Sequence, residues 1–228
     1  MENTRERTTE NIKLKPDNIL LSIHYCLYDF FGPLHWWPAD EELEVIVGAI
    51  LTQNTNWKNV SKALKIIKEN NLLNVRTLFE IDEKYLGTLI KPCGYYNLKA
   101  KRLKNFISFF YQKYKGSTKK MFSKDCWLLR EELLNINGIG RETADSILLY
   151  AGEKPVFVVD AYTKRIFKRH KLLSEKDNYE QIQRYFMEQL PSDERLFNEF
   201  HAQIVMVGKK YCKRNNPDCQ KCPLSEFF

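Results

Sequence analysis

Residues 133–150, LLNINGIGRETADSILLY, place one isoleucine between two glycines and join two apolar, helix-like runs. Gly138 and Gly140 permit a tight turn, because glycine adopts backbone conformations that other residues avoid. The stretch therefore predicts two helices joined by a hairpin. With no side chains in the way, the N–H groups at the start of the second helix could bind an anion at the positive end of its dipole. Two interpretations remain open at this point: a phosphate grip, or an ordinary turn between helices.

Most of the remaining chain also shows helical periodicity. Residues 42–52 are almost wholly apolar and predict a central, buried helix, whereas 59–70 and 97–114 each combine an apolar stripe with a polar face. Further helices are expected at 161–171, 178–190 and 193–210.

Local capping patterns predict where several helices begin and end. Thr77 with Glu80 forms a capping-box pattern, and Ser123 is a candidate N-cap for the first hairpin helix. Gly152 is expected to end the second hairpin helix. The β-branched run 156–160 is too isolated to imply a sheet, so the chain predicts an all-α fold, with two lobes.

Composition narrows the class of protein. The 228 residues are 43% hydrophobic and 29% charged, which is ordinary for a globular chain. A formal net charge of +7 favours a polyanionic partner. Residues 1–16 are polar and predict a mobile tail with no signal-peptide core. No apolar run is long enough to span a membrane, so we expect a cytoplasmic protein.

Asp160 follows an apolar run and precedes a basic helix, twenty positions after Gly140. Together, LLNINGIGRETADSIL and VVDAYTKR resemble the helix-hairpin-helix DNA glycosylases of the endonuclease III superfamily, over roughly residues 18–225. The resemblance implies two helical lobes with a central cleft, and Asp160 as the catalytic carboxylate within it. It also implies that the partner is double-stranded DNA with a damaged base, that the protein is a monomer and that it associates with the nucleoid. Independently, Asp160 suits the N-cap of the helix that follows.

The resemblance also implies a division of the chain. One lobe, a helical barrel with the hairpin, is expected to span 41–150, and the other to combine 17–40 with 151–211. A cysteine-containing loop is expected at 212–228.

The residue type at position 142 distinguishes two kinds of glycosylase. Bifunctional members of the superfamily carry a lysine two residues after the second hairpin glycine, and its amine forms a Schiff base with the damaged nucleotide. Here that position is Glu142, and neither Lys154 nor Lys164 matches it. The difference favours a monofunctional, hydrolytic glycosylase. A bifunctional glycosylase and lyase for damaged pyrimidines, and a non-catalytic DNA-binding protein, are the alternatives.

Residues 34–57, LHWWPADEELEVIVGAILTQNTNW, carry a narrower resemblance to the 3-methyladenine DNA glycosylases of this superfamily. By that match Trp36, Trp37, Pro38 and Trp57 would line the base pocket. Aromatic faces attract a cationic alkylated purine through cation–π interactions. The alternative is that these tryptophans pack in the core or between lobes.

The resemblance further implies a set of DNA contacts. Gln53 would enter the space that a flipped base leaves, and Tyr95, in the turn 93–102, would press against the opposite strand. The basic face that begins at Lys99 would lie near phosphates, or would simply be solvated. The expected DNA-binding residues are Gln53, Tyr95, Lys99, Gly138, Ile139, Gly140 and Arg141.

Cys212, Cys219 and Cys222 have the spacing of the superfamily's iron–sulfur loop. Many members add a fourth cysteine at the position that Phe228 occupies here. The resemblance therefore implies a [4Fe–4S] cluster with an incomplete set of ligands, which the glycosylase chemistry does not need. A borrowed ligand, a labile cluster and a loop without metal all remain open. A zinc site is disfavoured, because no histidine lies beside these cysteines.

Overall fold

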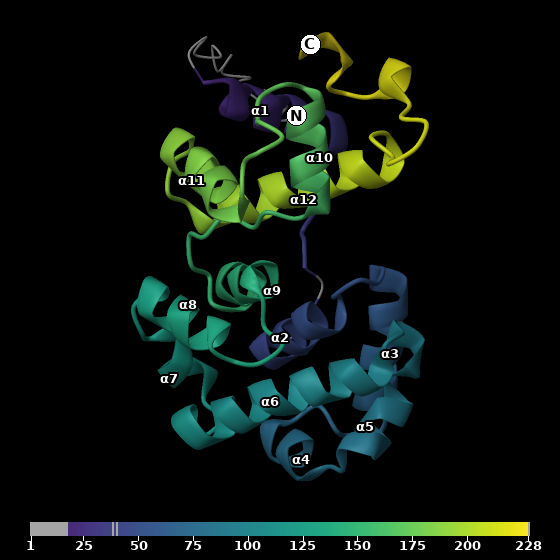
Figure 1. Cartoon of the computed structure of the whole chain (residues 1–228), viewed down its shortest axis with the longest axis vertical. Coiled ribbons are helices and arrows are strands. Elements are labelled where there is room, and N and C mark those ends of the chain that lie inside the picture. Colours follow the sequence, from purple (N-terminus) through teal and green to yellow (C-terminus); the bar gives the residue numbers. More distant parts are fainter. Residues whose placement is uncertain (1–17, 38, 40, 228) are drawn as a thin grey trace, which may run out of the picture.

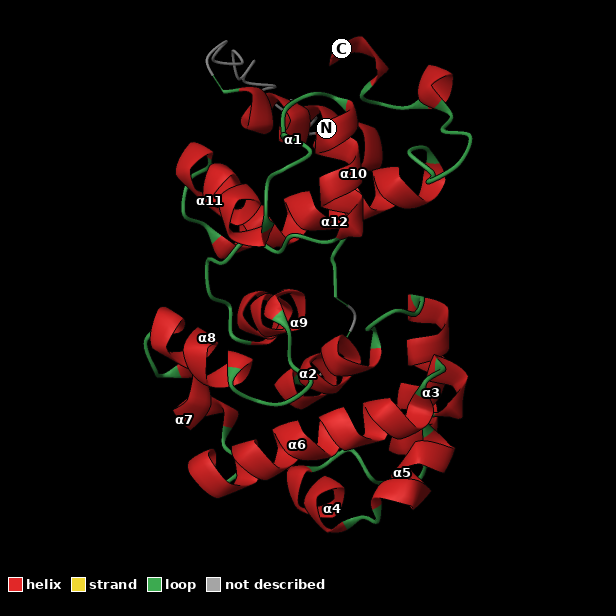
Figure 2. Ribbon diagram, in the orientation of Figure 1, coloured by secondary structure: helices red, strands yellow, loops and turns green. Residues whose placement is uncertain are grey.

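The computed structural model describes residues 18–37, 39 and 41–227. These residues form α-helices and short helical turns but no strand, as Figure 2 shows. The helices gather in two lobes (Figure 1), which confirms the predicted all-α, two-lobed fold. The predicted tail, Pro38 and Phe228 lie outside the described residues.

The first lobe, the lower one in Figure 1, contains eight of the described α-helices and the hairpin. They are α2 (Glu42–Leu51), α3 (Trp57–Glu69), α4 (Val75–Glu80), α5 (Glu83–Leu89), α6 (Tyr96–Tyr114), α7 (Thr118–Phe122), α8 (Cys126–Leu134) and α9 (Arg141–Ser146). A π-helical turn, η2 (Ile147–Ala151), continues α9, and a 3-10 turn, η1 (Lys91–Cys93), precedes α6.

The second lobe joins the start of the described chain to its end. It contains α1 (Ile19–Phe31), α10 (Ala161–Arg169), α11 (Tyr179–Gln189) and α12 (Glu194–Lys210), followed by the 3-10 turns η3 (Cys219–Lys221) and η4 (Ser225–Phe227). Across both lobes, no helix of the described residues combines the length and apolarity that a membrane span requires.

Each lobe has its own hydrophobic core. In the first lobe, α2 is buried along almost its whole length, as its apolar sequence predicts. The predicted stripe of α6, from Leu103 to Tyr114, packs against it. In the second lobe, Phe157 stacks on Phe186 with ring centroids 4.1 Å apart, and both belong to a core shared with α1 and α12. Burial of this apolar surface stabilises each lobe.

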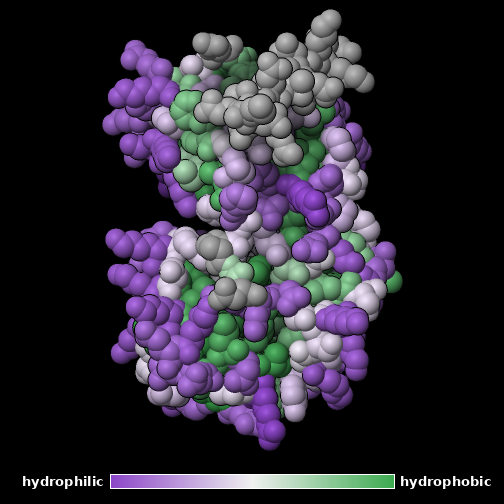
Figure 3. All heavy atoms as spheres, turned by 180° about the vertical axis from the view of Figure 1, so that it is seen from behind, coloured by the Kyte–Doolittle hydropathy of each residue, from purple (hydrophilic) through white to green (hydrophobic). Residues whose placement is uncertain are grey.

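The second helix of the hairpin, α9 with its continuation η2, connects the two cores. Its π-helical part, η2, contacts α2 of the first lobe and α12 of the second. Seen from behind in Figure 3, hydrophilic side chains cover much of both lobes, and an indentation separates them at one edge.

Two predicted caps were wrong. The side chain of Asn74 accepts a hydrogen bond from the Thr77 N–H, so α4 begins before Thr77. Asp125 caps α8, whereas Ser123 ends α7. In both cases a short polar side chain close in sequence has the extended backbone that an N-cap needs. Gly152 follows the last turn of η2, as predicted.

Candidate active site between the lobes

A cleft of about 1060 Å³ lies between the lobes, close to the upper limit of the usual size of ligand sites in proteins. Its walls come from the α2–α3 turn, the hairpin, the start of α10 and the last turns of α12. The cleft brings together most of the residues that the sequence singles out: Trp36, Trp37, Gln53, Trp57, Gly138, Ile139, Gly140, Arg141 and Asp160. Tyr95, Lys99 and the three loop cysteines are not among its lining residues.

Asp160 is buried at the start of α10, where it is the N-cap that the sequence predicts. Its Oδ1 accepts hydrogen bonds from the backbone N–H and the hydroxyl of Thr163, at 2.7 and 2.9 Å. Its Oδ2 accepts no hydrogen bond from the described residues. One oxygen is therefore used to hold the side chain, and the other remains available to a ligand in the cleft.

His201, on α12, faces the available oxygen of Asp160. Burial lowers the pKa of His201, which favours a neutral imidazole at neutral pH. Burial also raises the pKa of Tyr150 well above its usual value, so its hydroxyl stays protonated, and it shares a hydrogen bond with His201 Nδ1. The Nε2 atom is buried and has no hydrogen-bond partner among the described residues. Neither Tyr150 nor His201 is predicted as a site residue from the sequence, since helical spacing alone marks both as core.

Aromatic rings form one wall of the cleft. Trp37 packs against Trp57 with ring centroids 4.9 Å apart, and against Tyr150 at 5.0 Å. Gly48 makes room for this pair, because a Cβ there would lie 3.2 Å from the Trp37 ring. Trp36 lies apart from them, under the ammonium group of Lys209 at 5.1 Å.

Three further ionisable side chains line the cleft beside Asp160. Burial, reinforced by the charge of Asp160, raises the pKa of Glu142 to about 7, and Lys164 opposes that rise. Glu142 is exposed by its accessible surface, so solvent screens part of this effect, and its carboxylate forms no hydrogen bond with the described residues. Burial lowers the pKa of Lys209, while Asp160 opposes the shift. From the sequence, Glu142 is notable only as the replacement of a lysine, and no local pattern marks Lys209.

The hairpin has the geometry that its glycines predict. Gly138 has a φ of 96°, and a Cβ there would lie 2.3 Å from the side chain of Arg102. Gly140 is the N-cap of α9, and no atom lies within 4 Å of where its Cβ would be. Ile139 between them is buried. The backbone at Gly140 is therefore open to close approach by a ligand.

Gln53 ties the α2–α3 turn to this hairpin. Its Nε2 donates to the Gly138 carbonyl at 3.0 Å and to the Thr143 hydroxyl at 2.9 Å, while Arg102 donates to its Oε1. Insertion of Gln53 into DNA, which the resemblance implies, requires these hydrogen bonds to break.

Lys99 does not lie on an exposed basic face, and that part of the prediction was wrong. Its side chain is 1% exposed, and Nζ donates to the Cys93 carbonyl at 2.7 Å. Lys104 likewise donates to the carbonyls at the end of α4. These ammonium groups satisfy backbone carbonyls that would otherwise lack partners. Tyr95, by contrast, is 74% exposed at the start of α6.

The three loop cysteines differ in their surroundings. Cys212 and Cys222 are buried and Cys219 is exposed. The Arg169 guanidinium donates to Cys212 Sγ at 3.3 Å. A fourth cysteine, Cys26 on α1, reaches this loop, and its thiol donates to the Pro223 carbonyl at 3.3 Å.

No group of three or more His, Cys, Asp or Glu side chains within the described ranges is arranged to hold a metal ion. Burial raises the pKa of Cys222, and the thiols of Cys212, Cys219 and Cys26 each add to the rise. The thiols of Cys212, Cys219 and Cys26 thus each lie within electrostatic range of Cys222. The cluster itself stays a prediction.

Comparison with known proteins places this site in a family. Residues 47–192 match the model of the HhH-GPD superfamily base excision DNA repair proteins. The chain is 49% identical over 211 residues to the Methanocaldococcus jannaschii protein "Putative DNA repair glycosylase MJ1434", covering 92% of this chain and 95% of that protein. It is 29% identical over 191 residues to endonuclease III of Thermotoga maritima, covering 82% and 84% of the two chains.

Solved structures show the same fold. The H. pylori 3-methyladenine DNA glycosylase MagIII, bound to 1,N6-ethenoadenine, superposes with a TM-score of 0.72 at 29% identity, covering 84% of this chain and 97% of that one. A non-covalent endonuclease III–DNA complex superposes with a TM-score of 0.76 at 22% identity, covering 91% and 94%. The family model, the relatives and the fold agree: the chain belongs to the HhH-GPD superfamily of base excision DNA repair proteins and is a DNA glycosylase.

Proposed function

We propose that this glycosylase is monofunctional and hydrolyses the N-glycosidic bond of cationic alkylated purines, such as 3-methyladenine, in duplex DNA. The observation that carries the proposal is the placement of Trp37, Trp57 and Tyr150 in the same cleft as the available Asp160 oxygen. Stacking on aromatic faces attracts a positively charged base, by about 0.5–2 kcal/mol for each desolvated contact. The relatives named for 3-methyladenine and endonuclease III support the class of reaction.

The chemistry follows from these groups. A base that already carries a positive charge leaves as a neutral purine when the bond to C1′ breaks. The positive charge then develops on the sugar, where the carboxylate of Asp160 stabilises it. Water adds to C1′ and loses a proton, for which the same carboxylate is a suitable acceptor. The product is an abasic site.

The absence of a lyase step rests on Glu142. A carboxylate cannot attack C1′ to form an imine, and Lys164 and Lys209 are the lysines that line the cleft among the described residues. Either would have to reach C1′ from outside the motif position. A bifunctional enzyme for damaged pyrimidines is therefore the second candidate.

We assign DNA binding to the hairpin and to the exposed Tyr95. The open backbone at Gly140 suits a phosphate, and such contacts position DNA without reading its sequence. Tyr95 is exposed enough to press on the duplex while the damaged base leaves the stack. Flipping a base costs a few kcal/mol, and damaged bases are easier to flip.

The cysteine loop would hold a [4Fe–4S] cluster through Cys212, Cys219 and Cys222, with Cys26 as the fourth thiolate. A single zinc ion would need all four sulfurs about 2.3 Å away, whereas a four-iron cluster gives each thiolate its own iron and keeps the sulfurs farther apart. The contact of Cys26 with the residue after Cys222, and the electrostatic effect of the other three thiols on Cys222, support this arrangement. The cluster would supply structural stability and a redox centre remote from Asp160.

The decisive experiment incubates the protein with methylated duplex DNA and identifies the released bases by chromatography. We expect free 3-methyladenine and an unbroken abasic strand. Faster release of an oxidised pyrimidine from the same duplex, with strand cleavage, would replace this proposal with the second candidate.

A further inference from the structure

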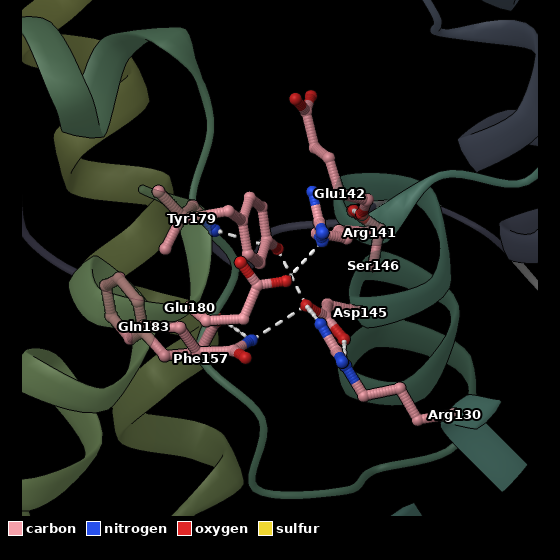
Figure 4. Close-up of polar contacts among 10 residues, drawn as sticks. Arg130, Arg141, Glu142, Asp145, Ser146, Phe157, Tyr179, Glu180 and Gln183 are labelled. Carbon is pink, nitrogen blue, oxygen red and sulfur yellow. Dashed lines mark hydrogen bonds and ion pairs between the residues drawn. The ribbon is translucent and has the colours of Figure 1, made fainter. Parts of the chain in front are cut away.

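Asp145, on the hairpin helix α9, is a fully buried carboxylate with four donors (Figure 4). Arg130 of α8 donates from Nε to Oδ1 at 2.6 Å and from Nη2 to Oδ2 at 3.0 Å. Two side chains from α11 also donate to Oδ2, the Tyr179 hydroxyl and the Gln183 amide, each at 2.7 Å. A buried charge persists only where it is paired and hydrogen-bonded, and this one meets both conditions.

The same two α11 side chains also hold the segment that leads to Asp160. The Val159 N–H donates to the Tyr179 hydroxyl at 3.4 Å, and the Gln183 amide donates to the Phe157 carbonyl at 2.7 Å. Burial, followed by the charge of Asp145, raises the pKa of Tyr179 well above its usual value, so its hydroxyl stays protonated. The hydroxyl therefore donates to Asp145 and accepts from the residue next to Asp160.

These bonds join the two functional parts of the cleft. The hairpin belongs to the first lobe and is the expected phosphate contact, whereas Asp160 begins α10 of the second lobe. Apart from this buried network, α9 and α11 are linked by the exposed ion pair between Arg141 and Glu180, also seen in Figure 4. Exposed ion pairs contribute little to the geometry or stability of a protein.

We propose that Asp145 and Tyr179 are positioning residues that set Asp160 in register with the DNA-gripping hairpin. The inference rests on the proposed role of Asp160. The hairpin holds the DNA backbone and thereby locates C1′, while the α11 bridge locates the carboxylate that must meet it. A displacement of about 1 Å at such a site can cost roughly 100-fold in rate. Neither residue needs to touch the reacting atoms.

Tyr179→Phe tests this directly, because it removes the hydroxyl and leaves the ring. Tyr114→Phe is the matched control: Tyr114 is also 8% exposed, and its hydroxyl donates to the carboxylate of Glu132, within the first lobe. The measurements are the single-turnover excision rate at saturating protein, the Kd for the same duplex, the melting temperature, and amide hydrogen exchange across residues 157–163.

We expect Tyr179→Phe to slow excision by about 10- to 100-fold, to leave the Kd within about twofold because the phosphate contacts lie elsewhere, and to speed exchange around Asp160. Tyr114→Phe should lower the melting temperature comparably and leave excision and exchange at 157–163 unchanged. Gln183→Met, which removes the other link, should resemble Tyr179→Phe.

Excision by Tyr179→Phe at the wild-type rate, or a loss matched by Tyr114→Phe, would overturn the inference. Should the wild type release no base from methylated DNA, the proposed function fails, and the exchange measurement still decides this point. Faster exchange next to Asp160 in Tyr179→Phe alone supports the bridge, and unchanged exchange refutes it.

Discussion

Asp160 Oδ2 lies 3.7 Å from His201 Nε2, beyond hydrogen-bond distance, and both residues line the cleft. The two atoms are the unsatisfied ends of two held side chains. Thr163 fixes the other oxygen of Asp160, and Tyr150 fixes the other nitrogen of His201. A water or a sugar oxygen bound beside them could form a hydrogen bond with each of these two atoms. We propose that the attacking water binds beside this pair.

Asp160→Asn is expected to lower base release by at least about 100-fold, because the amide cannot stabilise the positive charge that develops on the sugar. The Asn side chain can still cap α10, so the fold should persist. The measurement is single-turnover release from methylated duplex, with Kd measured in parallel. Near-normal release would remove Asp160 from the mechanism, whereas lost DNA binding would indicate a misfolded cleft.

The ionisation of Glu142 should appear in the pH dependence of excision. Its pKa of about 7 in the folded protein means that the cleft gains a second negative charge as pH rises through neutrality. Release of a cationic base should therefore rise across this range, and Glu142→Gln should flatten the profile. Glu131→Gln, on the exposed face of α8, is the control. A Glu142→Gln profile identical to wild type would contradict the assignment.

The raised pKa of Glu142 also predicts how the stability of the fold changes with pH. The pKa of Glu142 is raised on folding from its ordinary value of 4.5, so the unfolded chain ionises first as pH rises. Glu142 should therefore reduce stability as pH increases from about 4.5 to about 7, and have no such effect below that window. Urea unfolding of wild type and Glu142→Gln at pH 4 and pH 8 measures the difference. A variant that gains no stability at the higher pH would show that solvent screens the charge completely.

Borohydride reduction separates hydrolysis from lyase chemistry. The wild-type protein is expected not to be trapped on damaged DNA, because Glu142 occupies the position where an amine would form the imine. Glu142→Lys should become trappable if the position faces C1′. Efficient trapping of wild type would mean that another lysine attacks; Lys164→Ala and Lys209→Ala would then identify it.

The aromatic wall predicts selectivity for cationic bases. Trp37→Ala or Trp57→Ala should cost about 1–3 kcal/mol in transition-state stabilisation for 3-methyladenine, the range for a lost base–aromatic stack. Affinity for undamaged DNA should change little. Trp127→Ala, at an exposed tryptophan on α8, controls for the loss of an indole. If these substitutions slow the excision of neutral hypoxanthine and of 3-methyladenine equally, the tryptophans act through packing rather than through charge recognition.

Iron content tests the cysteine arrangement. Protein purified anaerobically should absorb broadly in the visible range and contain iron, and Cys26→Ser should reduce the iron bound per chain. Cys126→Ser is the matched control, since Cys126 is also half-buried but lies in the first lobe. Iron-free wild-type protein of ordinary stability would exclude the cluster. Iron unaffected by Cys26→Ser would assign the fourth ligand elsewhere.

Local sequence patterns determined much of this protein. Helical periodicity predicted α2, α3, α6, α10, α11 and α12, because one apolar stripe per helix is a property of residues a few positions apart. The Gly-Ile-Gly sequence predicted the hairpin, and the position of Asp160 predicted that it caps α10. Both features depend on backbone conformation within a few residues.

The tertiary structure decided which polar groups face the cleft. Lys99 belongs by spacing to a basic face, yet it turns inward to a carbonyl that packing leaves without a partner. Tyr150 and His201 are far apart in sequence and become neighbours only when η2 meets α12. Asp145 similarly acquires its role from α11. Hydrogen-bond partners and pKa shifts depend on burial and on distant side chains, neither of which a helical pattern contains.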